Sequence, residues 1–594
     1  MSGHRNTRWH WIIHSLVIVS FVILSLLRHL EIGGDCTGYW YFSRVLIETG
    51  EFIIPDRSPL YTVYLTLFGW LGYPTSATLE YIVTTSFAAL SLFFFSKHYL
   101  RTSLATIVAL LWMLYLYSAV PPVQAMALGC CCLAIVARRK WAGRKGKSVS
   151  YALFGFAYLF RGTYLLFLLA FIVWDFVEVM RKRSWKSLRS SVRPRLYDLL
   201  LLIVIMLPIL FAVNQSSDPW NTAWFTTTKY FPADGKSLAD ASFIQAFNRR
   251  YAEIKYGDTD AKDFYFTNQE VFNGASTTLG AIKENPEFVM KQWGWNAKEM
   301  PYTTVRITSI PIFWNAAVRF GFVLHDVGRT IILALLILLT IYGAIKQSIN
   351  KKEWIFILIC IMALIPNMIF GIPQYQYLLP LAPVLIVGAS WFHDMIDKYL
   401  RVAGAKLKNL FSRSKQKLDY IYILFRVPVW RGFVIGFIVL VLLSPGLGHW
   451  ADFTKNLVLD VKQGDIRVLD RRDWTKQNFS EIELIIANCQ GVMALEHSFL
   501  GAFSSLPREK FYDVLEIPPY GRLHESEYDG LRPERIDCLL ISKILQTGKG
   551  TGTNFGTRYQ NYIQPYMQEL LRMGASSIEI PGYGRAVILK YPKN

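Results

Sequence analysis

The sequence predicts a polytopic α-helical membrane protein with a soluble α/β domain at its C-terminal end. Of its 594 residues, 53% are hydrophobic and 18% are charged, whereas soluble proteins carry about 25% charged residues. Apolar runs long enough to cross a hydrocarbon core of about 30 Å recur along residues 1–447 and give about 11 transmembrane helices. Beyond them, short strand and helix patterns over residues 448–594 indicate a separate soluble domain.

The charge pattern places the loops on two sides of the membrane. The net charge of +20 does not indicate a nucleic-acid ligand, because the excess Lys and Arg lies in loops between apolar runs, as the positive-inside rule describes. Arg5 and Arg8 precede the first run, residues 11–27, and place the N-terminus in the cytoplasm. The large loop, residues 214–326, holds 11 Lys and Arg against 12 Asp and Glu, and we expect it on the external face.

The first external loop, residues 29–78, is expected to form two short helices. A helix lying on the membrane surface is indicated by apolar residues at three- and four-residue spacing, Tyr39, Phe42 and Leu46. Thr37 is its expected N-cap and Gly50 its expected stop. A second apolar helix, Leu60 to Leu71, follows the Ser58-Pro59 break.

The remaining spans alternate in direction along the chain. They are expected over residues 81–95, 104–117, 123–136, 150–160, 164–180, 199–213, 331–344, 354–370, 377–391 and 433–447. The two arms around Arg161 are the shortest, but the basic loops at both ends require both of them. The odd number of crossings then leaves the terminal domain outside.

The terminal domain shows several short secondary-structure patterns. Strands are expected at Glu481 to Ala487, Ile536 to Ser542, Ile578 to Ile580 and Ala586 to Lys590, with an amphipathic helix from Tyr559 to Met573 ended by Gly574. No phosphate-binding glycine loop, metal-ligand cluster or catalytic-triad spacing is present in it. Cys489 and Cys538 could pair if this domain lies outside the cytoplasm, whereas the four cysteines in apolar runs are expected to be packing residues.

Four segments in the membrane part resemble a known family. They are an Asp just after the first span followed by Tyr39-Trp40-Tyr41, then Ser58-Pro59-Leu60-Tyr61, then Phe160-Arg161-Gly162-Thr163-Tyr164, and finally Gln376-Tyr377-Leu378-Leu379-Pro380-Leu381-Ala382-Pro383. In this order they resemble GT-C fold glycosyltransferases that use polyprenyl-phosphate sugars, and are nearest to protein mannosyltransferases and the aminoarabinose transferase of lipid A. The resemblance implies a GT-C-like fold over roughly residues 10–450.

The chain departs from that pattern at two positions. Gln124 stands in the second external loop, where many members of the family carry an acid. Gln376 stands where they usually carry an Arg. Both departures weaken the transfer of roles beyond Asp35, and they are compatible with a different donor or acceptor.

Sugar transfer from a lipid phosphate needs a base for the acceptor hydroxyl and positive charge for the departing phosphate. Asp35 is the expected catalytic carboxylate; the alternative is an acid placed at a helix start by the macrodipole. Asp56 is a second candidate acid or a turn residue beside proline. Arg57 and Arg161 are candidate phosphate contacts, with snorkelling or a structural ion pair as the alternative.

Three polar or aromatic residues complete the expected substrate-binding set: Tyr61, Gln376 and Tyr377. Interfacial aromatic belts are the alternative explanation for Tyr377. The aromatic residues of the large loop are expected to pack that loop, with the binding of an acceptor sugar as the alternative. One carboxylate without a neighbouring His or second acid does not make a metal site, so no cofactor is expected, and a divalent metal has no support in the sequence.

The sequence therefore predicts an inverting glycosyltransferase acting on the external face. Its expected partners are a polyprenyl-phosphate-linked sugar, the lipid bilayer and a glycan, glycolipid or protein acceptor. The expected location is a bacterial inner membrane, with the site and the terminal domain on the periplasmic side. The alternatives are a transporter or flippase of lipid-linked sugars and a non-catalytic membrane scaffold. A transporter would show charged residues near mid-span and broken helices.

Overall fold

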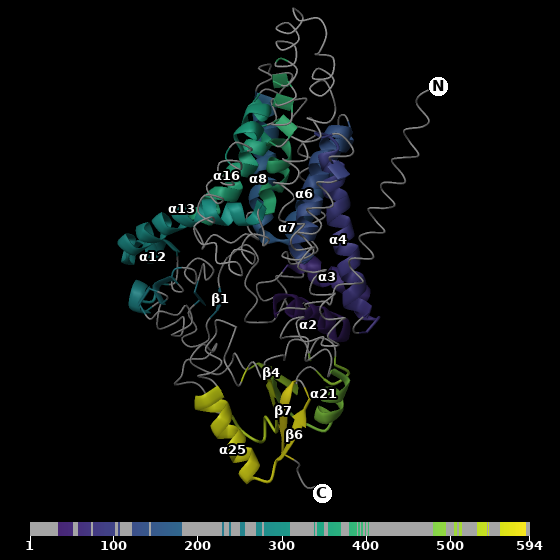
Figure 1. Ribbon diagram of the computed structural model, residues 1–594, viewed down its shortest axis with the longest axis vertical. Helices are drawn as coiled ribbons and strands as arrows, with labels where there is room; N and C mark the ends of the chain where they lie inside the picture. The colour runs from purple at the N-terminus through teal and green to yellow at the C-terminus, as the bar shows by residue number, and fades with distance from the viewer. Residues whose placement is uncertain are drawn as a thin grey trace, which may run out of the picture.

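The computed structural model describes a helical part and a C-terminal sheet domain (Figure 1). The longer described stretches are residues 34–50, 58–72, 75–100, 122–141, 144–180, 269–275, 278–308, 341–349, 354–369, 379–388, 479–494, 504–507, 510–513, 531–542, 559–581 and 583–589. Shorter pieces lie at residues 105–106, 229–230, 237–238, 247, 250–252, 254–255, 338, 390–391, 394–395, 398–399, 402, 500 and 545.

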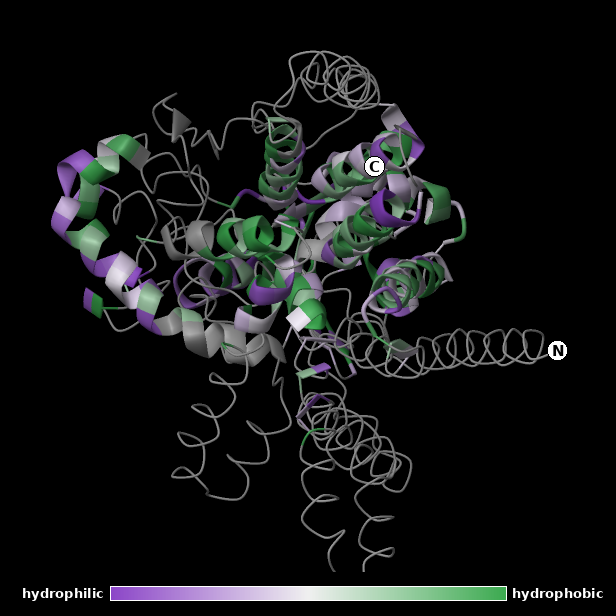
Figure 2. Ribbon diagram, turned by 90° about the horizontal axis from the view of Figure 1, so that it is seen from above, coloured by the Kyte–Doolittle hydropathy of each residue, from purple (hydrophilic) through white to green (hydrophobic). Residues whose placement is uncertain are grey.

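The helical part contains a bundle whose helices run side by side (Figures 1 and 2). The described helices of this part are α2 (Gly34–Thr49), α3 (Pro59–Gly69), α4 (Thr75–Ser96), α6 (Pro122–Lys140), α7 (Arg144–Phe160), η1 (Gly162–Tyr164), α8 (Leu165–Met180), α16 (Ile355–Ile369) and η4 (Leu379–Leu381). Of these, α2 and α3 lie across the direction of the bundle (Figure 1). In the bundle α6 packs between α4 and α7, and α8 packs against α16. Small residues allow the close approach of α6, since a Cβ on Gly129 would lie 2.7 Å from the Phe87 ring of α4.

Two of the described helices, α4 and α6, are long and apolar enough to cross a membrane. Helices α8 and α16 are apolar but shorter. The expected spans at residues 11–27, 199–213 and 433–447 lie outside the described residues, as does nearly all of 104–117. The predicted number of 11 crossings therefore stays a prediction.

Several helix boundaries differ from those expected. Helix α2 begins at Gly34, so Thr37 lies inside it and is not its N-cap. Gly50 follows its last residue with a φ of 69°, a left-handed conformation that favours glycine, as the expected stop requires. Helix α4 begins at Thr75 and not near Tyr81, and therefore includes Glu80. The spans expected at residues 123–136 and 150–160 are extended toward each other, because α6 runs to Lys140 and α7 begins at Arg144.

A buried ion pair holds the basic end of α6 to α8. The guanidinium of Arg138 donates to the Asp175 carboxylate, and both side chains are nearly inaccessible, at 7% and 2% exposure. The Lys147 ammonium lies 3.8 Å from the same carboxylate, and the Tyr151 hydroxyl donates to it at 3.0 Å. The Arg138 guanidinium also lies 4.0 Å from the Trp174 ring centroid. Three helices, α6, α7 and α8, are thus joined by one carboxylate.

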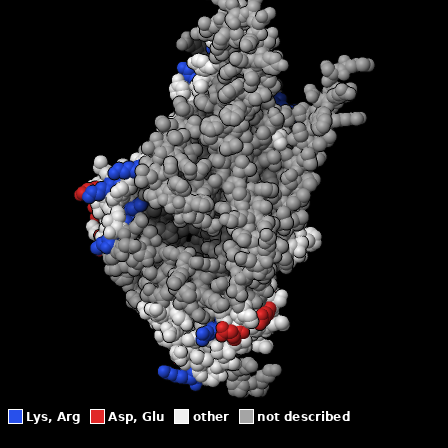
Figure 3. Space-filling model, in the orientation of Figure 1, with Lys and Arg blue, Asp and Glu red and all other residues white. Residues whose placement is uncertain are grey.

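The large loop folds around a small apolar cluster of its own. The cluster consists of Phe247, Val271, Phe272, Ala281 and Val289, and it involves helices α12 (Thr278–Glu284) and α13 (Pro286–Thr308). Trp295 meets Phe288 edge to face, with ring centroids 5.9 Å apart, and Trp293 packs against the cluster, so these two aromatic residues pack the loop as expected. Lys and Arg side chains gather on the surface of α12 and α13 (Figure 3). Strands β1 (Lys229–Tyr230) and β2 (Ser237–Leu238) pair antiparallel.

The C-terminal domain is built on a mixed five-stranded sheet with the order β4-β3-β5-β7-β6. The strands are β3 (Val492–Ala494), β4 (Phe511–Asp513), β5 (Cys538–Ser542), β6 (Ser576–Ile580) and β7 (Gly584–Ile588). Strand β3 is parallel to β4 and β5, and β7 is antiparallel to β5 and β6. All five residues of the central strand β5 are buried, so both faces of the sheet are covered. The three expected strands at β5, β6 and β7 are confirmed.

One helix packs on each face of this sheet (Figure 1). Helix α25 (Gln564–Arg572), preceded by a π-helical turn from Tyr559 to Ile563, covers the face of Leu539 and Ile541. Gly574 ends it with a φ of 94°, as expected. Helix α21 (Phe479–Ile486) belongs to the core of the other face. The strand expected over Glu481 to Ala487 was therefore wrong: Ile482 and Ile486 are buried while Leu484 is 79% exposed, which is a helical period.

Candidate functional site

Asp35, the expected catalytic acid, lies in the first turn of α2. One helical turn further along, Tyr39 is buried, with 2% of its surface exposed. Tyr39 and Trp40 belong to the main apolar core, so this end of α2 is anchored in the protein. The position of Asp35 is therefore set by the packing of the turn that follows it.

Tyr39 joins α2 to the second expected segment, which opens α3. Its ring meets the Tyr61 ring edge to face, with centroids 5.0 Å apart. The backbone N–H of Ser58 donates to the Tyr39 hydroxyl oxygen at 3.4 Å. Pro59 occupies the first position of α3, where its missing N–H costs nothing. The Asp35 helix and the Ser-Pro-Leu-Tyr segment are thus in direct contact.

Ser58 also joins α3 to the hairpin of Arg161. The Ser58 hydroxyl donates to the Leu159 carbonyl at 2.6 Å, across 101 residues of chain. The rings of Tyr64 and Phe160 meet edge to face, with centroids 6.3 Å apart. Arg161 follows in extended backbone, half-buried, between α7 and η1. Three of the four expected segments therefore meet in the structure.

The fourth segment and several expected residues are described only in part. Leu379 and Leu381 lie buried in the same apolar core as Tyr39 and Tyr61. Four expected site residues lie outside the described residues, so their roles stay predictions: Asp56, Arg57, Gln376 and Tyr377. Gln124, the residue that replaces an expected acid, is buried near the start of α6.

Glu80 is a residue that the sequence reasoning missed. It lies in the second turn of α4 and is 3% exposed. One of its carboxylate oxygens accepts hydrogen bonds from the Tyr61 hydroxyl at 2.8 Å and from the Thr84 hydroxyl at 2.7 Å. The signal that could have found it is a lone acid beside an apolar run, because an ionisable residue in a membrane helix is expensive unless it has a function or a partner.

The C-terminal domain contacts α2 through Arg44. Its guanidinium donates to the backbone carbonyls of Ser504 and Leu506, the latter at 3.0 Å, and pairs with Glu48 at 2.5 Å. Glu483 of α21 stabilises the same segment, since its carboxylate accepts from the Ser504 hydroxyl at 2.9 Å and from a neighbouring backbone N–H. Partial burial raises the pKa of Glu483, but these hydrogen bonds and the charge of Arg44 outweigh it, and the pKa lies below its ordinary value.

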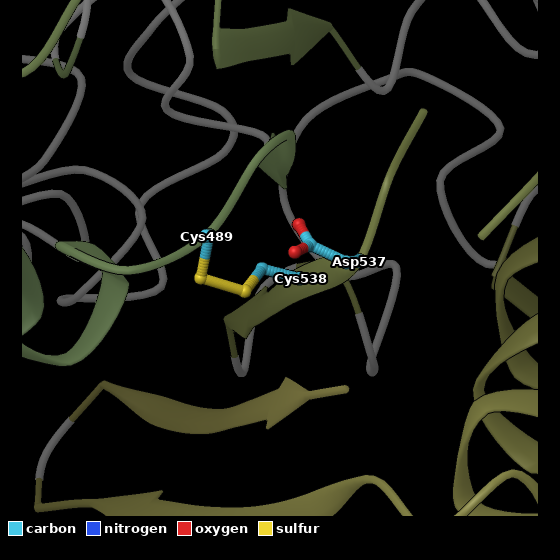
Figure 4. Close-up of side chains that lie close together, drawn as sticks. All are labelled: Cys489, Asp537 and Cys538. Atoms are coloured by element: carbon cyan, nitrogen blue, oxygen red, sulfur yellow. A yellow bond between two sulfur atoms is a disulfide. The ribbon is translucent and has the colours of Figure 1, made fainter. Parts of the chain in front are cut away.

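The three residues with metal-ligand chemistry that cluster in the described part do not form a metal site. They are Cys489, Asp537 and Cys538, with their ligand atoms within 4.8 Å of one another (Figure 4). The two sulfurs form a disulfide. One Asp537 oxygen accepts from the backbone N–H groups of Gln490 and Gly491, both at 2.9 Å. The cluster therefore links the residues just before β3 to the start of β5, and the two cysteines, whose pairing the sequence left open, form a disulfide.

Comparisons with known proteins find similarity only at the level of structure. No protein-family model matches the chain, and no curated protein matches its sequence. The crystal structure of ArnT from Cupriavidus metallidurans bound to undecaprenyl phosphate matches at a TM-score of 0.43 and 12% identity, over 99% of this chain and 100% of that chain. The archaeal oligosaccharyltransferase AglB from Archaeoglobus fulgidus, in complex with an inhibitory peptide and a dolichol-phosphate, matches at 0.44 and 11%, over 98% and 75%.

The Archaeoglobus fulgidus oligosaccharyltransferase in its apo form matches at a TM-score of 0.47 and 11% identity, over 98% of this chain and 74% of that chain. The structural match to ArnT and AglB thus extends over nearly the whole of this chain. At these TM-scores and identities the likeness decides nothing about activity, which has to be argued from the residues.

Proposed function

We propose that this protein is a membrane glycosyltransferase that moves a sugar from a polyprenyl-phosphate donor to an acceptor, with Asp35 as general base. The observation that carries the proposal is the meeting of three distant segments. Tyr39 of α2 contacts Tyr61 and Ser58, and Ser58 binds the carbonyl of Leu159, two residues before Arg161. An acid-bearing helix and an Arg-bearing turn are thereby held together.

This arrangement suits transfer from a lipid phosphate. A carboxylate within hydrogen-bond reach of the acceptor hydroxyl can take its proton as the new glycosidic bond forms. A guanidinium can stabilise the phosphate that departs, by charge-assisted and bidentate hydrogen bonds. Asp35 in the first turn of α2 is assigned the first role, and Arg161 at the end of α7 the second. Direct attack by the acceptor would invert the anomeric centre.

The acidic residues of the described helices favour an enzyme over a transporter. A transporter would carry charged residues near mid-span and broken helices. Glu80 lies in the second turn of α4, close to the N-terminal end of the helix and away from its middle. Asp175 of α8 is paired with Arg138 and is therefore part of a structural ion pair. Helices α4 and α6 are continuous over 22 and 19 residues.

The disulfide supports an external position for the C-terminal domain. Disulfides persist in oxidising compartments and are rare in the cytosol. Cys489 and Cys538 are paired and buried. Since Arg44 of α2 binds this domain, the site would lie on the same external face, where a lipid-linked sugar and not a cytosolic nucleotide sugar is the donor.

We propose a metal-independent reaction. A chelator titration of the purified protein tests it: transfer should be unchanged, and a loss that added divalent metal restores would contradict the proposal.

The first step of the test is to identify the sugar and the acceptor in cells. Mass analysis of envelope glycans with and without the protein should show one sugar missing in its absence. Complementation with Asp35→Asn should fail to restore that sugar, and purified Asp35→Asn should transfer about 10²–10⁴-fold more slowly. Glu48→Gln is the matched control on the same helix, because Glu48 is partly exposed and pairs only locally. Full transfer by Asp35→Asn would refute the assignment.

A further inference from the structure

A buried carboxylate fixes α3 against α4 beside the candidate site. Glu80 accepts two hydroxyl hydrogen bonds on one oxygen, from Tyr61 of α3 and Thr84 of α4. The Thr84 hydroxyl in turn forms a 3.0 Å hydrogen bond with that of Tyr64, one turn after Tyr61. Two tyrosines of α3 are thereby tied to two residues on one face of α4, and α3 cannot rotate without breaking the network.

A carboxylate is a costly way to hold two apolar helices together. Removing an acid from water is costly whether it stays charged or takes up a proton, and well-packed hydrophobic residues of similar volume are often as stabilising as a buried polar group. Within the described residues no cation pairs with Glu80, whose described partners are hydroxyl groups. Stability alone therefore does not explain an acid at this position. An acid that holds the Tyr61 hydroxyl in one orientation does explain it.

The network extends to the helix of the proposed base. The Tyr61 ring lies edge to face against Tyr39, at 5.0 Å, and Tyr39 is one helical turn from Asp35. We infer that Glu80 is a positioning residue of the proposed transfer site, which acts through Tyr61 and Tyr39 to set the first turn of α2 relative to α4. The inference rests on the proposed function and adds a residue to it.

The experiment separates positioning from stability with four variants of the full-length protein in lipid. Glu80→Leu and Tyr61→Phe each remove the hydrogen bond between the two side chains. Both should lower kcat by about 10–100-fold, as expected when a reacting group is misplaced by a fraction of an ångström to one ångström, with little change in the KM for the donor. An unchanged KM in Tyr61→Phe would also mean that Tyr61, which is 2% exposed, does not bind the donor as the sequence predicts. Glu80→Gln keeps an acceptor oxygen and should fall between these variants and the wild type. Thr85→Ala is the control, because among the described residues the Thr85 hydroxyl bonds to backbone carbonyls of its own helix and to nothing on α3.

The double variant gives the sharpest result. Glu80→Leu leaves the Tyr61 hydroxyl without its acceptor, and adding Tyr61→Phe removes that hydroxyl, so thermal stability should recover. The kcat of the double variant should nevertheless stay as low as that of either single variant. Losses that multiply, or activity that recovers with stability, would overturn the inference.

A second readout does not depend on transfer. Hydrogen–deuterium exchange of the peptide covering residues 35–45 should speed up by about tenfold in Tyr61→Phe and Glu80→Leu, the factor expected for the loss of one hydrogen bond, and should not change in Thr85→Ala. Unchanged exchange in the first two would also overturn the inference. The proposed function is judged separately. If Asp35→Asn is inactive while Glu80→Leu and Tyr61→Phe are fully active, only the role of Glu80 is refuted. An active Asp35→Asn sinks the assigned base.

Discussion

Replacing Arg44 with Ala should release the C-terminal domain from α2. The guanidinium donates to two backbone carbonyls, of Ser504 and Leu506, and its side chain is only 17% exposed. Hydrogen bonds from a charged group contribute about 1.5–3 kcal/mol each, and their sum is reduced here because part of the guanidinium stays in contact with water. We therefore expect Arg44→Ala to cost about 2–3 kcal/mol in the docking of residues 504–506.

That cost corresponds to a roughly 30- to 150-fold larger fraction of molecules in which this segment is undocked, at tenfold per 1.4 kcal/mol. The assay is hydrogen–deuterium exchange of the peptide containing Ser505 and Leu506, whose backbone N–H groups bond to Glu483 and to the Ser504 hydroxyl. Glu48→Gln is the control, since the loss of an exposed pair four residues away on one helix costs only about 0.3–0.5 kcal/mol. Equal exchange in Arg44→Ala and the wild type, or an equal effect of Glu48→Gln, would refute the reasoning.

Three further predictions concern stability and are read from thermal unfolding of the purified protein. Asp175→Ala removes the carboxylate that pairs with the buried guanidinium of Arg138 and should destabilise by about 3–5 kcal/mol, whereas Asp175→Asn, which keeps an acceptor, should cost less. Replacing both Cys489 and Cys538 with Ser opens a loop of 49 residues and should cost about 4 kcal/mol by the chain-entropy estimate; reductant should then affect the wild type and not the variant. Because the folded pKa of Glu483 is lowered, its contribution is complete above its ordinary pKa near 4.5 and is lost as the pH falls through the folded value, and Glu483→Gln should remove that part of the pH dependence.

The sequence predicted the structure best where its hydrophobic pattern fits only one type of secondary structure. The apolar runs led to α4, α6, α7, α8 and α16, because a continuous run of this length has no alternative to a helix in a membrane. The last helix was predicted together with its stop at Gly574, where a φ of 94° requires a residue without Cβ strain. The disulfide was left open by the sequence, which offered only two cysteines in a domain expected outside the cytoplasm, and the structure joins them.

The prediction failed where a short apolar segment fits both the two-residue period of a strand and the 3.6-residue period of a helix. Residues 481–487 read as a buried strand, but a strand would bury Ile482, Leu484 and Ile486 on one face, and the structure leaves Leu484 79% exposed. Tertiary packing against the sheet decides between the two, and the local sequence does not contain it. Glu80 was missed for a related reason: the apolar run starts at Tyr81 in the sequence, whereas the helix starts about a turn and a half earlier, at Thr75.

The contacts of α2 give the C-terminal domain a place in the candidate site that its own sequence does not suggest. Tyr39 and Arg44 are five residues apart, so they project about 140° apart around the helix axis. Tyr39 contacts α3 of the membrane part, and Arg44 binds the carbonyls of the C-terminal segment. Helix α2 is therefore held from two sides, by groups that belong to different parts of the chain. A domain without a catalytic pattern can in this way determine where the first turn of α2, and with it Asp35, comes to lie.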